Sequence, residues 1–436
     1  MVELMVIALF AISLFLCVGL NISVLAALVF GFVLFFAYGL YKKHSAREMA
    51  AFAVSGIKTV RNVLFNFVLI GMITAVWRSS GTIAYIVYHA TRFCSPHGMV
   101  LITFWLCCLI SFLTGTAFGT AATMGVICVT MANSMGIPLL YSGGAVMSGA
   151  YFGDRYSPMS TSAMLISTLT RTDQFKNLTA MFRTAVIPFI LTCCVYVVMG
   201  MGFDASCDVS GMREIFADAF VMHPAVIIPA LLVLVLSLFR INVKITMGVS
   251  ILCGVAIAIG IQKLAPMEML KIAVFGYTPE NEAIRAALSG GGILSMVKVF
   301  CIVCISSSYS GMFNGTGLLD GLRQAMCRLS RKITPFGGVL AASVLTGLIA
   351  CNQTLTIMLT DQLCEETDDA EHMALYLEDT AVVISALTPW SIACVVPLSS
   401  VGAPAACVLT SCFLYLLPLC SCIKSVINRP PKSCFA

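Results

Sequence analysis

The chain has 436 residues, of which 59% are hydrophobic and only 10% are charged, and its formal net charge is +5. A soluble domain carries about 25% charged residues, so this chain has too little charge to cover a water-facing surface of its size. The composition excludes a soluble globular protein, and the short, separate basic clusters exclude the continuous basic face that nucleic-acid binding needs.

Apolar segments follow one another along almost the whole chain. A helix that crosses the hydrocarbon core needs roughly 20 apolar residues, so the chain has room for about ten crossings. We predict an all-α polytopic membrane protein. The expected spans are Val2–Leu20, Ile22–Tyr41, Asn62–Trp77, Val100–Leu113, Thr179–Met201, Pro224–Phe239, Ile245–Ile261, Ile293–Ser308, Phe336–Ala350 and Ala403–Cys422.

The first apolar run begins at the N-terminus, where a signal peptide would lie. It lacks a basic n-region, and Asn21 leads directly into a second apolar run. We therefore expect a retained membrane span.

Charged residues cluster between the apolar runs. The positive-inside rule places the basic loops in the cytoplasm, together with both termini of a multi-pass protein of the plasma membrane. Loops rich in acidic residues are expected on the opposite side. The basic residues are Lys42, Lys43, Arg47, Arg171, Lys176, Arg183, Arg240, Lys244, Arg323, Arg328, Arg331, Lys332, Lys424, Arg429 and Lys432, and the acidic ones are Asp204, Asp208, Asp218, Glu365, Glu366, Asp368 and Asp369.

Two short basic stretches, Ser45–Lys58 and Leu318–Arg331, are amphipathic. They are expected either to lie in the membrane interface or to form solvated connecting helices.

Three short peptides recur in the same order in the two halves. Ser-Ser-Gly-Thr-Ile at Gly81 is similar to Gly-Thr-Gly-Leu-Leu at Gly317, with an offset of 236. Leu-Thr-Gly ending at Gly115 recurs at an offset of 232, and the tripeptide ending at Asp154 is similar to that ending at Asp379, at an offset of 225. The small spread of the offsets indicates a duplicated unit, which is the usual construction of secondary transporters.

The repeat divides the chain into five parts. Whether the two units are inverted or parallel is not decided by these matches, and an inverted pair is the expectation for folds with broken helices or re-entrant hairpins near the membrane midplane. The parts are an N-terminal transmembrane pair (1–44), a first repeat with site motifs at 114–123 and 149–162 (45–202), connecting helices and loops (203–290), a second repeat with site motifs at 346–356 and 377–391 (291–423), and a cytoplasmic tail (424–436).

Two segments lie at membrane depth but are too polar and glycine-rich to be plain helices. Irregular backbone is tolerated in a membrane only where it is buried in protein or lines a polar cavity. Glycines allow a helix to break there, and the break exposes backbone groups beside oxygen ligands that suit sodium. Close packing through small residues is the alternative. The candidate ligands are Thr114, Thr116 and Thr120 in the first segment and Asn352, Gln353 and Thr354 in the second.

The second pair of segments carries carboxylates in otherwise uncharged surroundings. An ionisable group inside a membrane segment is costly and is by default a functional candidate. An aspartate binds a cation when ionised and carries a proton when desolvated, which permits competition between sodium and protons. The candidates are Asp154 with Ser157, Ser160 and Thr161, and Asp379 with Glu378, Thr380 and Trp390.

Asp154 and Asp379 are the expected transient sodium ligands. Glu378 competes with Asp379, and the sequence does not rank them. A structural ion pair between Asp154 and Arg155 is disfavoured, because adjacent helical residues project in different directions.

These residues resemble the NhaC-type sodium/proton antiporters. The similar positions in the first half are Trp77 with Ser80–Ile83, then Thr114–Thr116, Gly119, Thr120 and Gly125, then Gly149–Asp154 with Ser157, Pro158 and Ser160. Those in the second half are Thr316–Asp320, Leu377–Asp379 and Pro389–Trp390. The resemblance spans roughly Gly71 to Gly402, and the block around Asp154 is its most specific part. It implies an ion-transporter fold with broken helices and cation-coupled exchange by alternating access.

The chain also departs from the family pattern. The family's Ser-Asp-Thr-Thr-Asn run appears here as Ser160–Met164, without its carboxylate and amide. Phe118 replaces a tryptophan and Ser391 an asparagine. Sodium/proton antiport remains the first hypothesis, and cation-coupled transport of a small organic solute, an amino acid or a carboxylate, is the alternative. A requirement for organic substrate would separate them.

Other classes of protein fit less well. No His-Glu-x-x-His motif, phosphate-binding loop or dinucleotide fingerprint is present, so an enzyme, a cofactor and ATP-driven transport are not expected. Cys301 and Cys304 have no second ligand pair and are read as packing residues. A channel would leave the carboxylates without a coupling role. The expected partners are the bilayer, sodium or protons, a small organic solute in the alternative function, and a second copy in a homodimer.

Overall fold

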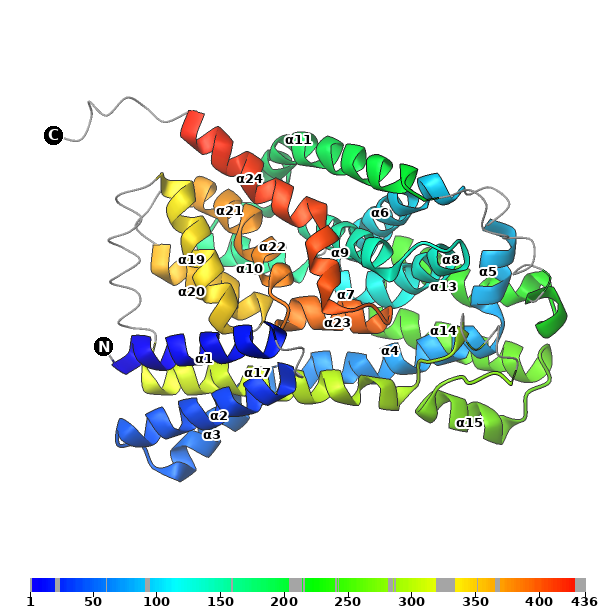
Figure 1. Cartoon of the computed structure of the whole chain (residues 1–436), viewed down its shortest axis with the longest axis horizontal. Helices are drawn as coiled ribbons and strands as arrows, with labels where there is room; N and C mark the ends of the chain where they lie inside the picture. The colour runs from blue at the N-terminus through cyan, green and yellow to red at the C-terminus, as the bar shows by residue number, and fades with distance from the viewer. Residues whose placement is uncertain are drawn as a thin grey trace.

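The computed structural model of the chain is built from helices (Figure 1). It describes residues 2–19, 24–59, 61–90, 95–157, 160–203, 214, 216–239, 241, 243–280, 285, 288–318, 334–350, 352–364 and 369–427. Within these ranges the one extended pairing is a bridge between Tyr277 and Gly290. The predicted all-α class is confirmed.

Several helices are long and apolar enough to cross a bilayer. By length and composition there are four, Pro96–Thr114, Ala117–Ser134, Gln174–Met201 and Ile293–Thr316, and up to six if each of two bent pairs counts as one span. This is fewer than the ten predicted segments, because seven other apolar helices are only 10–17 residues long.

The N-terminal helices pack on a helix from the second half of the chain (Figure 1). The rings of Phe10, Phe35, Tyr309 and Phe313 meet edge to face between them, and the Tyr309 hydroxyl donates a hydrogen bond to the carbonyl of Leu28. Aromatic edge contacts of this kind stabilise a buried interface. The helices are α1 (Val2–Gly19), α2 (Val24–Tyr41), α3 (Ala46–Thr59) and α17 (Val297–Thr316).

Helix α3, one of the predicted amphipathic stretches, packs directly against α17. Its N-terminus is a capping box, in which Ser45 and Glu48 bond each other's backbone N–H groups at 2.8 and 3.2 Å. Gly56 faces the backbone of Ser307 and Gly311, so that the two helices approach closely. The second amphipathic stretch lies mostly outside the described residues.

Replacing Gly311 with leucine is expected to destabilise the protein. A Cβ at position 311 would lie 1.9 Å from the carbonyl oxygen of Phe52, and backbone cannot move aside as a side chain can. We expect a loss of about 1–3 kcal/mol or more, seen as a lower unfolding temperature in detergent. Gly260→Ala is the control, since a Cβ there meets nothing within 4 Å. Equal unfolding temperatures for both variants and the wild type would contradict the close packing.

The first half continues from the N-terminal helices into a bundle of helices, several of which are broken. Between α7 and α8 one turn is a π-helix, a rare irregularity that often marks functional sites. The elements are α4 (Arg61–Ser79), α5 (Thr82–Ala90), α6 (Pro96–Thr114), α7 (Ala117–Thr120), the π-helix η1 (Ala121–Gly125), α8 (Val126–Ser134), α9 (Leu139–Tyr156), α10 (Thr161–Thr170) and α11 (Gln174–Met201).

The remaining helices form the connection and the second half. The connecting elements are η2 (Pro224–Ile227), α13 (Ile228–Leu238), α14 (Val243–Gly260), α15 (Pro266–Phe275) and η3 (Ile293–Met296). After α17, the second half consists of α19 (Pro335–Ala350), α20 (Gln353–Cys364), α21 (Ala370–Asp379), α22 (Ala381–Leu387), α23 (Ile392–Ser400), η4 (Ala405–Thr410) and α24 (Cys412–Ile427).

Two helix pairs bend sharply at short breaks. The segment Leu64–Ser79 meets Thr82–His89 at 62°, and Ala370–Leu387 meets Ile392–Ser400 at 59°. Gly81 forms the first corner with a φ of +76°, a conformation that favours glycine. The expected broken helices are therefore present.

Helices α19 and α20 form a short hairpin. Thr346 on α19 bonds Thr360 on α20 at 2.7 Å, and Gly347 faces Thr356 nearer the break, so the two helices run antiparallel. Figure 1 shows that α19 begins, and α20 ends, at the side of the molecule where the N-terminus lies.

This hairpin changes the interpretation of one predicted span, Phe336–Ala350. Asp369, which caps α21, follows the end of α20 by five residues, so it lies on the side where α19 begins. The predicted span Phe336–Ala350 counts α19 as a full crossing, whereas α19 ends at Ala350 and α20 runs back from Gln353. The side of the membrane on which the acidic loop lies stays a prediction.

Two large hydrophobic cores hold most of the buried apolar residues that the structure describes. One contains residues of α4–α9, α11, α13–α15, α23 and α24, and the other contains residues of α1–α3, α17 and α19–α22. Helices α9 and α21 therefore belong mainly to different cores, and their C-terminal ends carry the carboxylates predicted from the sequence.

Candidate functional site

Four charged side chains are buried at the ends of α9 and α21. The exposed fraction is 5% for Asp154, 0% for Arg155, and 1% for both Glu378 and Asp379. If all four were ionised, three carboxylates would face one guanidinium. Buried charges must be paired or neutralised, so this excess of negative charge needs protons or cations.

Local helix breaks put these residues in place. Helix α9 ends at Tyr156, and Ser160 caps the start of α10, accepting bonds from two backbone N–H groups. Gly153 packs on the backbone of Ser111 and Phe112, which leaves no room for a Cβ and fixes the end of α9 against α6. Thr380 interrupts the helix between α21 and α22.

Asp154 is surrounded by oxygen-bearing side chains. The hydroxyl of Ser160 donates to one carboxylate oxygen at 3.1 Å, and that of Ser162 to the other at 3.5 Å. The side-chain amide of Gln353 lies beside the same carboxylate. Arg155 does not pair with it, as expected for neighbours on one helix. Asp154 and Gln353 thus bring together the second motif of the first half and the break of the second half.

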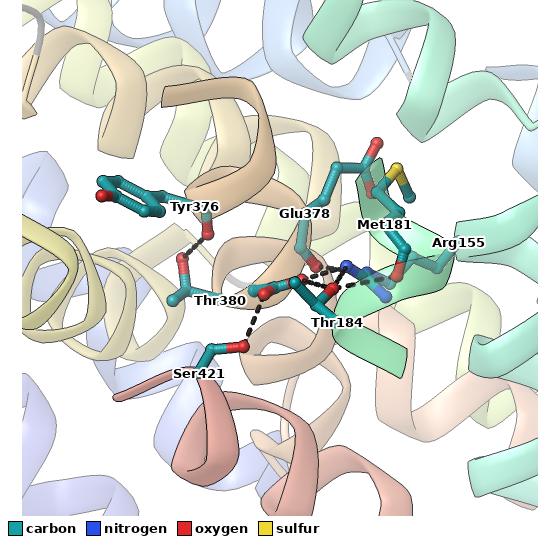
Figure 2. A network of polar contacts seen from close by, with 8 residues as sticks. Arg155, Met181, Thr184, Tyr376, Glu378, Thr380 and Ser421 are labelled. Atoms are coloured by element: carbon teal, nitrogen blue, oxygen red, sulfur yellow. Dashed lines mark hydrogen bonds and ion pairs between the residues drawn. The ribbon is translucent and has the colours of Figure 1, made fainter. Parts of the chain in front are cut away.

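Asp379 is held by three donors, Arg155, Thr184 and Ser421, all of which are labelled in Figure 2. It forms an ion pair with Arg155, accepts a hydrogen bond from Ser421 at 2.6 Å and accepts another from Thr184 at 3.4 Å. Ser421 belongs to α24 and Thr184 to α11, so four helices meet at this carboxylate. Its charge is compensated by the arginine.

Arg155 joins the two halves of the chain. Its Nε donates to the backbone carbonyl of Glu378 at 3.0 Å, and its guanidinium lies 4.5 Å from the ring centre of Tyr156. Its Nη1 is buried without a hydrogen-bond partner in the part of the chain that the structure describes. The pair with Asp379 uses only part of its donor capacity.

Glu378 is the least satisfied of the carboxyl groups. Its Oε2 is buried and accepts no hydrogen bond from any described residue. Figure 2 shows its carboxyl group extending away from the backbone carbonyl that Arg155 contacts. It lies within electrostatic range of Arg155, Asp154 and Asp379. Such a group is poised to be protonated or to meet a cation.

The threonines of the first break surround the turn at Gly115, which has a φ of +65°. Thr116 caps α7, and its hydroxyl accepts the N–H of Gly119. Thr114 and Thr120 approach each other with 3.4 Å between their hydroxyl oxygens. The π-helix follows at once, so the whole segment departs from regular α-helix.

The matching segment of the second half breaks at the predicted place. Asn352 caps α20 by accepting the N–H of Leu355 at 2.8 Å, and Thr354 is exposed. Thr380 donates to the carbonyl of Tyr376 at 2.7 Å, and the buried Trp390 donates from its ring to the carbonyl of Leu348 at 3.1 Å.

Sequence reasoning missed several members of the cluster. Arg155 was considered only as a partner of Asp154, although a lone arginine in an apolar segment is itself a signal. Ser162 stood in the predicted motif without a role. Thr184 and Ser421 had no local signal. Of the predicted residues, Ser157 is buried, whereas Thr161 is exposed.

A model of the Na+/H+ antiporter family matches the chain twice, over residues 1–178 and 149–427. Individual relatives share about a quarter of their residues with it. The chain is 26% identical over 369 residues to the Na+/H+ antiporter NhaC of Alkalihalophilus pseudofirmus, an alignment that covers 81% of this chain and 79% of that protein.

Other relatives of similar identity carry different names. The malate-2H+/Na+-lactate antiporter of Bacillus subtilis is 25% identical over 389 residues, covering 86% of this chain and 82% of that protein. The arginine/ornithine antiporter ArcD of Halobacterium salinarum is 25% identical over 362 residues, covering 78% of this chain and 73% of that protein. Since the two family matches together run from residue 1 to residue 427, the chain belongs to the Na+/H+ antiporter family.

Proposed function

We propose that the protein is a secondary transporter that exchanges sodium for protons through Asp154 and Glu378 by alternating access. The observation that carries the proposal is the buried cluster of three carboxylates with a single arginine. Arg155 compensates Asp379, which leaves two carboxyl groups whose charge must be balanced by protons or by a bound cation. Family membership supports cation/proton exchange.

Asp154 is the better candidate for the sodium ligand. The hydroxyls of Ser160 and Ser162 and the side-chain amide of Gln353 surround it, and hard oxygen ligands such as the carboxylate and the hydroxyls suit a hard cation. Thr114, Thr116, Thr120 and Asn352 would line the adjoining path at the two breaks. Thr161 and Thr354, being exposed, would meet the ion only outside the buried cluster.

We also propose that the two halves are inverted repeats. Both contain a helix, a break, a carboxylate-bearing helix and a capped return helix in the same order. In Figure 1, α6 begins at the end of the molecule where α5 lies, whereas its counterpart α19 begins at the end where the N-terminus lies. Opposite starting sides support inversion, and rocking of one unit against the other would then expose the cluster alternately.

Replacing Glu378 with glutamine is expected to lower transport without lowering the stability of the protein. The carboxyl oxygen Oε2 has no hydrogen-bond partner among the described residues, so a neutral amide of the same shape should not lower the unfolding temperature. Sodium-dependent proton movement should fall by about tenfold or more, since one proton-carrying group is removed. Unchanged transport would contradict the role of Glu378, and a large loss of stability would show that the carboxylate is structural.

Transport of an organic solute is the second candidate function. The relatives named for malate, lactate, arginine and ornithine are as similar to the chain as the sodium/proton antiporter is. Purified protein in liposomes with an interior pH dye would separate the two. Under a sodium gradient, a pH change without solute is expected for sodium/proton exchange. A response that requires malate, lactate or arginine would transfer the assignment to a cation-coupled solute carrier.

A further inference from the structure

We propose that Arg78, beside the corner between α4 and α5, binds the carboxylate group of a small organic anion. The site is separate from the carboxylate cluster, since Figure 1 places the α4–α5 corner and α21 toward opposite ends of the molecule. The inference goes beyond the proposed exchange, because it concerns recognition of an anion and needs neither sodium nor a proton gradient.

Arg78 is an enclosed cation that has no acidic partner among the residues the structure describes. Its Nε is buried and has no hydrogen-bond partner in the described part of the chain, while a part of the residue remains accessible. The ion pairs formed by the described residues are those of Glu3, Glu48, Asp369 and Asp379 with other bases. An enclosed guanidinium is costly unless a negative charge completes it.

A glycine turn fixes the guanidinium against the backbone. Gly290, Gly291 and Gly292 have φ values of +118°, +75° and +84°, and the N–H of Gly292 donates to the carbonyl of Gly71 at 2.7 Å. A Cβ at Gly290 would lie 3.4 Å from the Nη1 of Arg78. The turn therefore crosses α4, with Gly290 directly beside the guanidinium.

The turn is anchored independently of Arg78. Tyr277 and Gly290 exchange backbone hydrogen bonds of 3.0 and 2.9 Å, and Gly291 packs on Ala75. The backbone that covers the guanidinium is thus held on both sides. One side of the arginine is occupied by this backbone, and the accessible part is left for a ligand. A preorganised cation of this kind loses little entropy when it binds an anion.

The geometry of the Arg78 guanidinium favours one class of ligand. A guanidinium offers two parallel N–H donors, which match the two oxygens of a carboxylate. Chloride offers one centre and cannot use both donors in the same way. A small mono- or dicarboxylate is the ligand that this arrangement fits best.

The test is a binding measurement on the purified full-length protein in detergent. The unfolding temperature is measured with rising malate, lactate or chloride at constant ionic strength, without a sodium or pH gradient. We expect malate or lactate, but not chloride, to raise the unfolding temperature of the wild type. Arg78→Gln should abolish that rise, and Arg78→Lys should weaken the apparent affinity by about tenfold, because lysine lacks the two-point fork.

Arg61→Gln is the matched control, since Arg61 is an exposed arginine at the other end of the same helix. It should retain the wild-type response to carboxylates. If Arg78→Gln does not fold, the apparent carboxylate affinity of Arg78→Lys tests the proposal, because lysine keeps the positive charge. A wild-type affinity in Arg78→Lys, an equal response to chloride, or no response of the wild type to any of the three anions would overturn the proposal. None of these results depends on whether the protein exchanges sodium for protons.

Discussion

Replacing Asp154 with asparagine is expected to lower sodium-dependent proton movement by about 100-fold or more, since an amide can neither carry the proton nor balance the charge of sodium. The variant should still fold, because asparagine has the same shape and its amide can bond Ser160 and Ser162. The measurement is the pH change inside liposomes under an imposed sodium gradient, with purified wild type and variant at equal protein content.

Asp173→Asn is the matched control for this substitution. Asp173 is an exposed cap of α11 that accepts the N–H groups of Phe175 and Lys176, and asparagine caps a helix equally well. This control should exchange ions like the wild type. If Asp154→Asn also retained full exchange, Asp154 would not belong to the ion path and the proposed site would be misplaced.

The position of this carboxylate could be predicted from the sequence because the signal is local. An aspartate in an uncharged, apolar segment is conspicuous, and the glycines beside Thr114 and Thr346 marked the segments in which the helices break. Composition and apolar run length were likewise sufficient for the all-α class. These predictions depend only on residues close together in the sequence, because hydropathy and backbone preference are properties of short segments.

The pairing inside the cluster could not be predicted in this way. Arg155 and Asp379 are 224 residues apart, and Ser421 reaches the same carboxylate from the last helix. Which of Glu378 and Asp379 meets the arginine depends on the direction in which α21 presents them, and that direction is set by packing between the two cores. For a related reason the sequence could not distinguish a full span at Phe336–Ala350 from one arm of a hairpin, since an apolar run that turns back halfway has the same composition as one that crosses.

Replacing Arg155 with glutamine is expected to destabilise the protein strongly. The change leaves Asp379 buried and without its cation, and removing one partner of a buried ion pair costs about 3–5 kcal/mol. Asp379→Asn should be similarly damaging, because it leaves the guanidinium unpaired. Both effects are measured as the unfolding temperature and the yield of monodisperse protein in detergent.

The double variant Arg155→Gln with Asp379→Asn measures how strongly the stabilities contributed by the two side chains depend on each other. Two neutral amides can hydrogen-bond each other, so the double variant should be more stable than either single variant, with a coupling energy of about 2 kcal/mol or more. Stabilities that simply add would show that the two side chains do not depend on each other. Ser160→Ala, at the neighbouring carboxylate, is a control that leaves this pair intact.

The same double variant tests which carboxylate exchanges ions. In the proposed scheme Asp379 serves only to compensate Arg155, so removing both charges together leaves the net charge of the cluster unchanged and keeps Asp154 and Glu378. Sodium-dependent proton movement should then persist, within about tenfold of the wild type. A double variant that folds but no longer exchanges ions would instead identify Asp379 as the coupling carboxylate, and Arg155 would then be a tethered cation that competes with sodium for it.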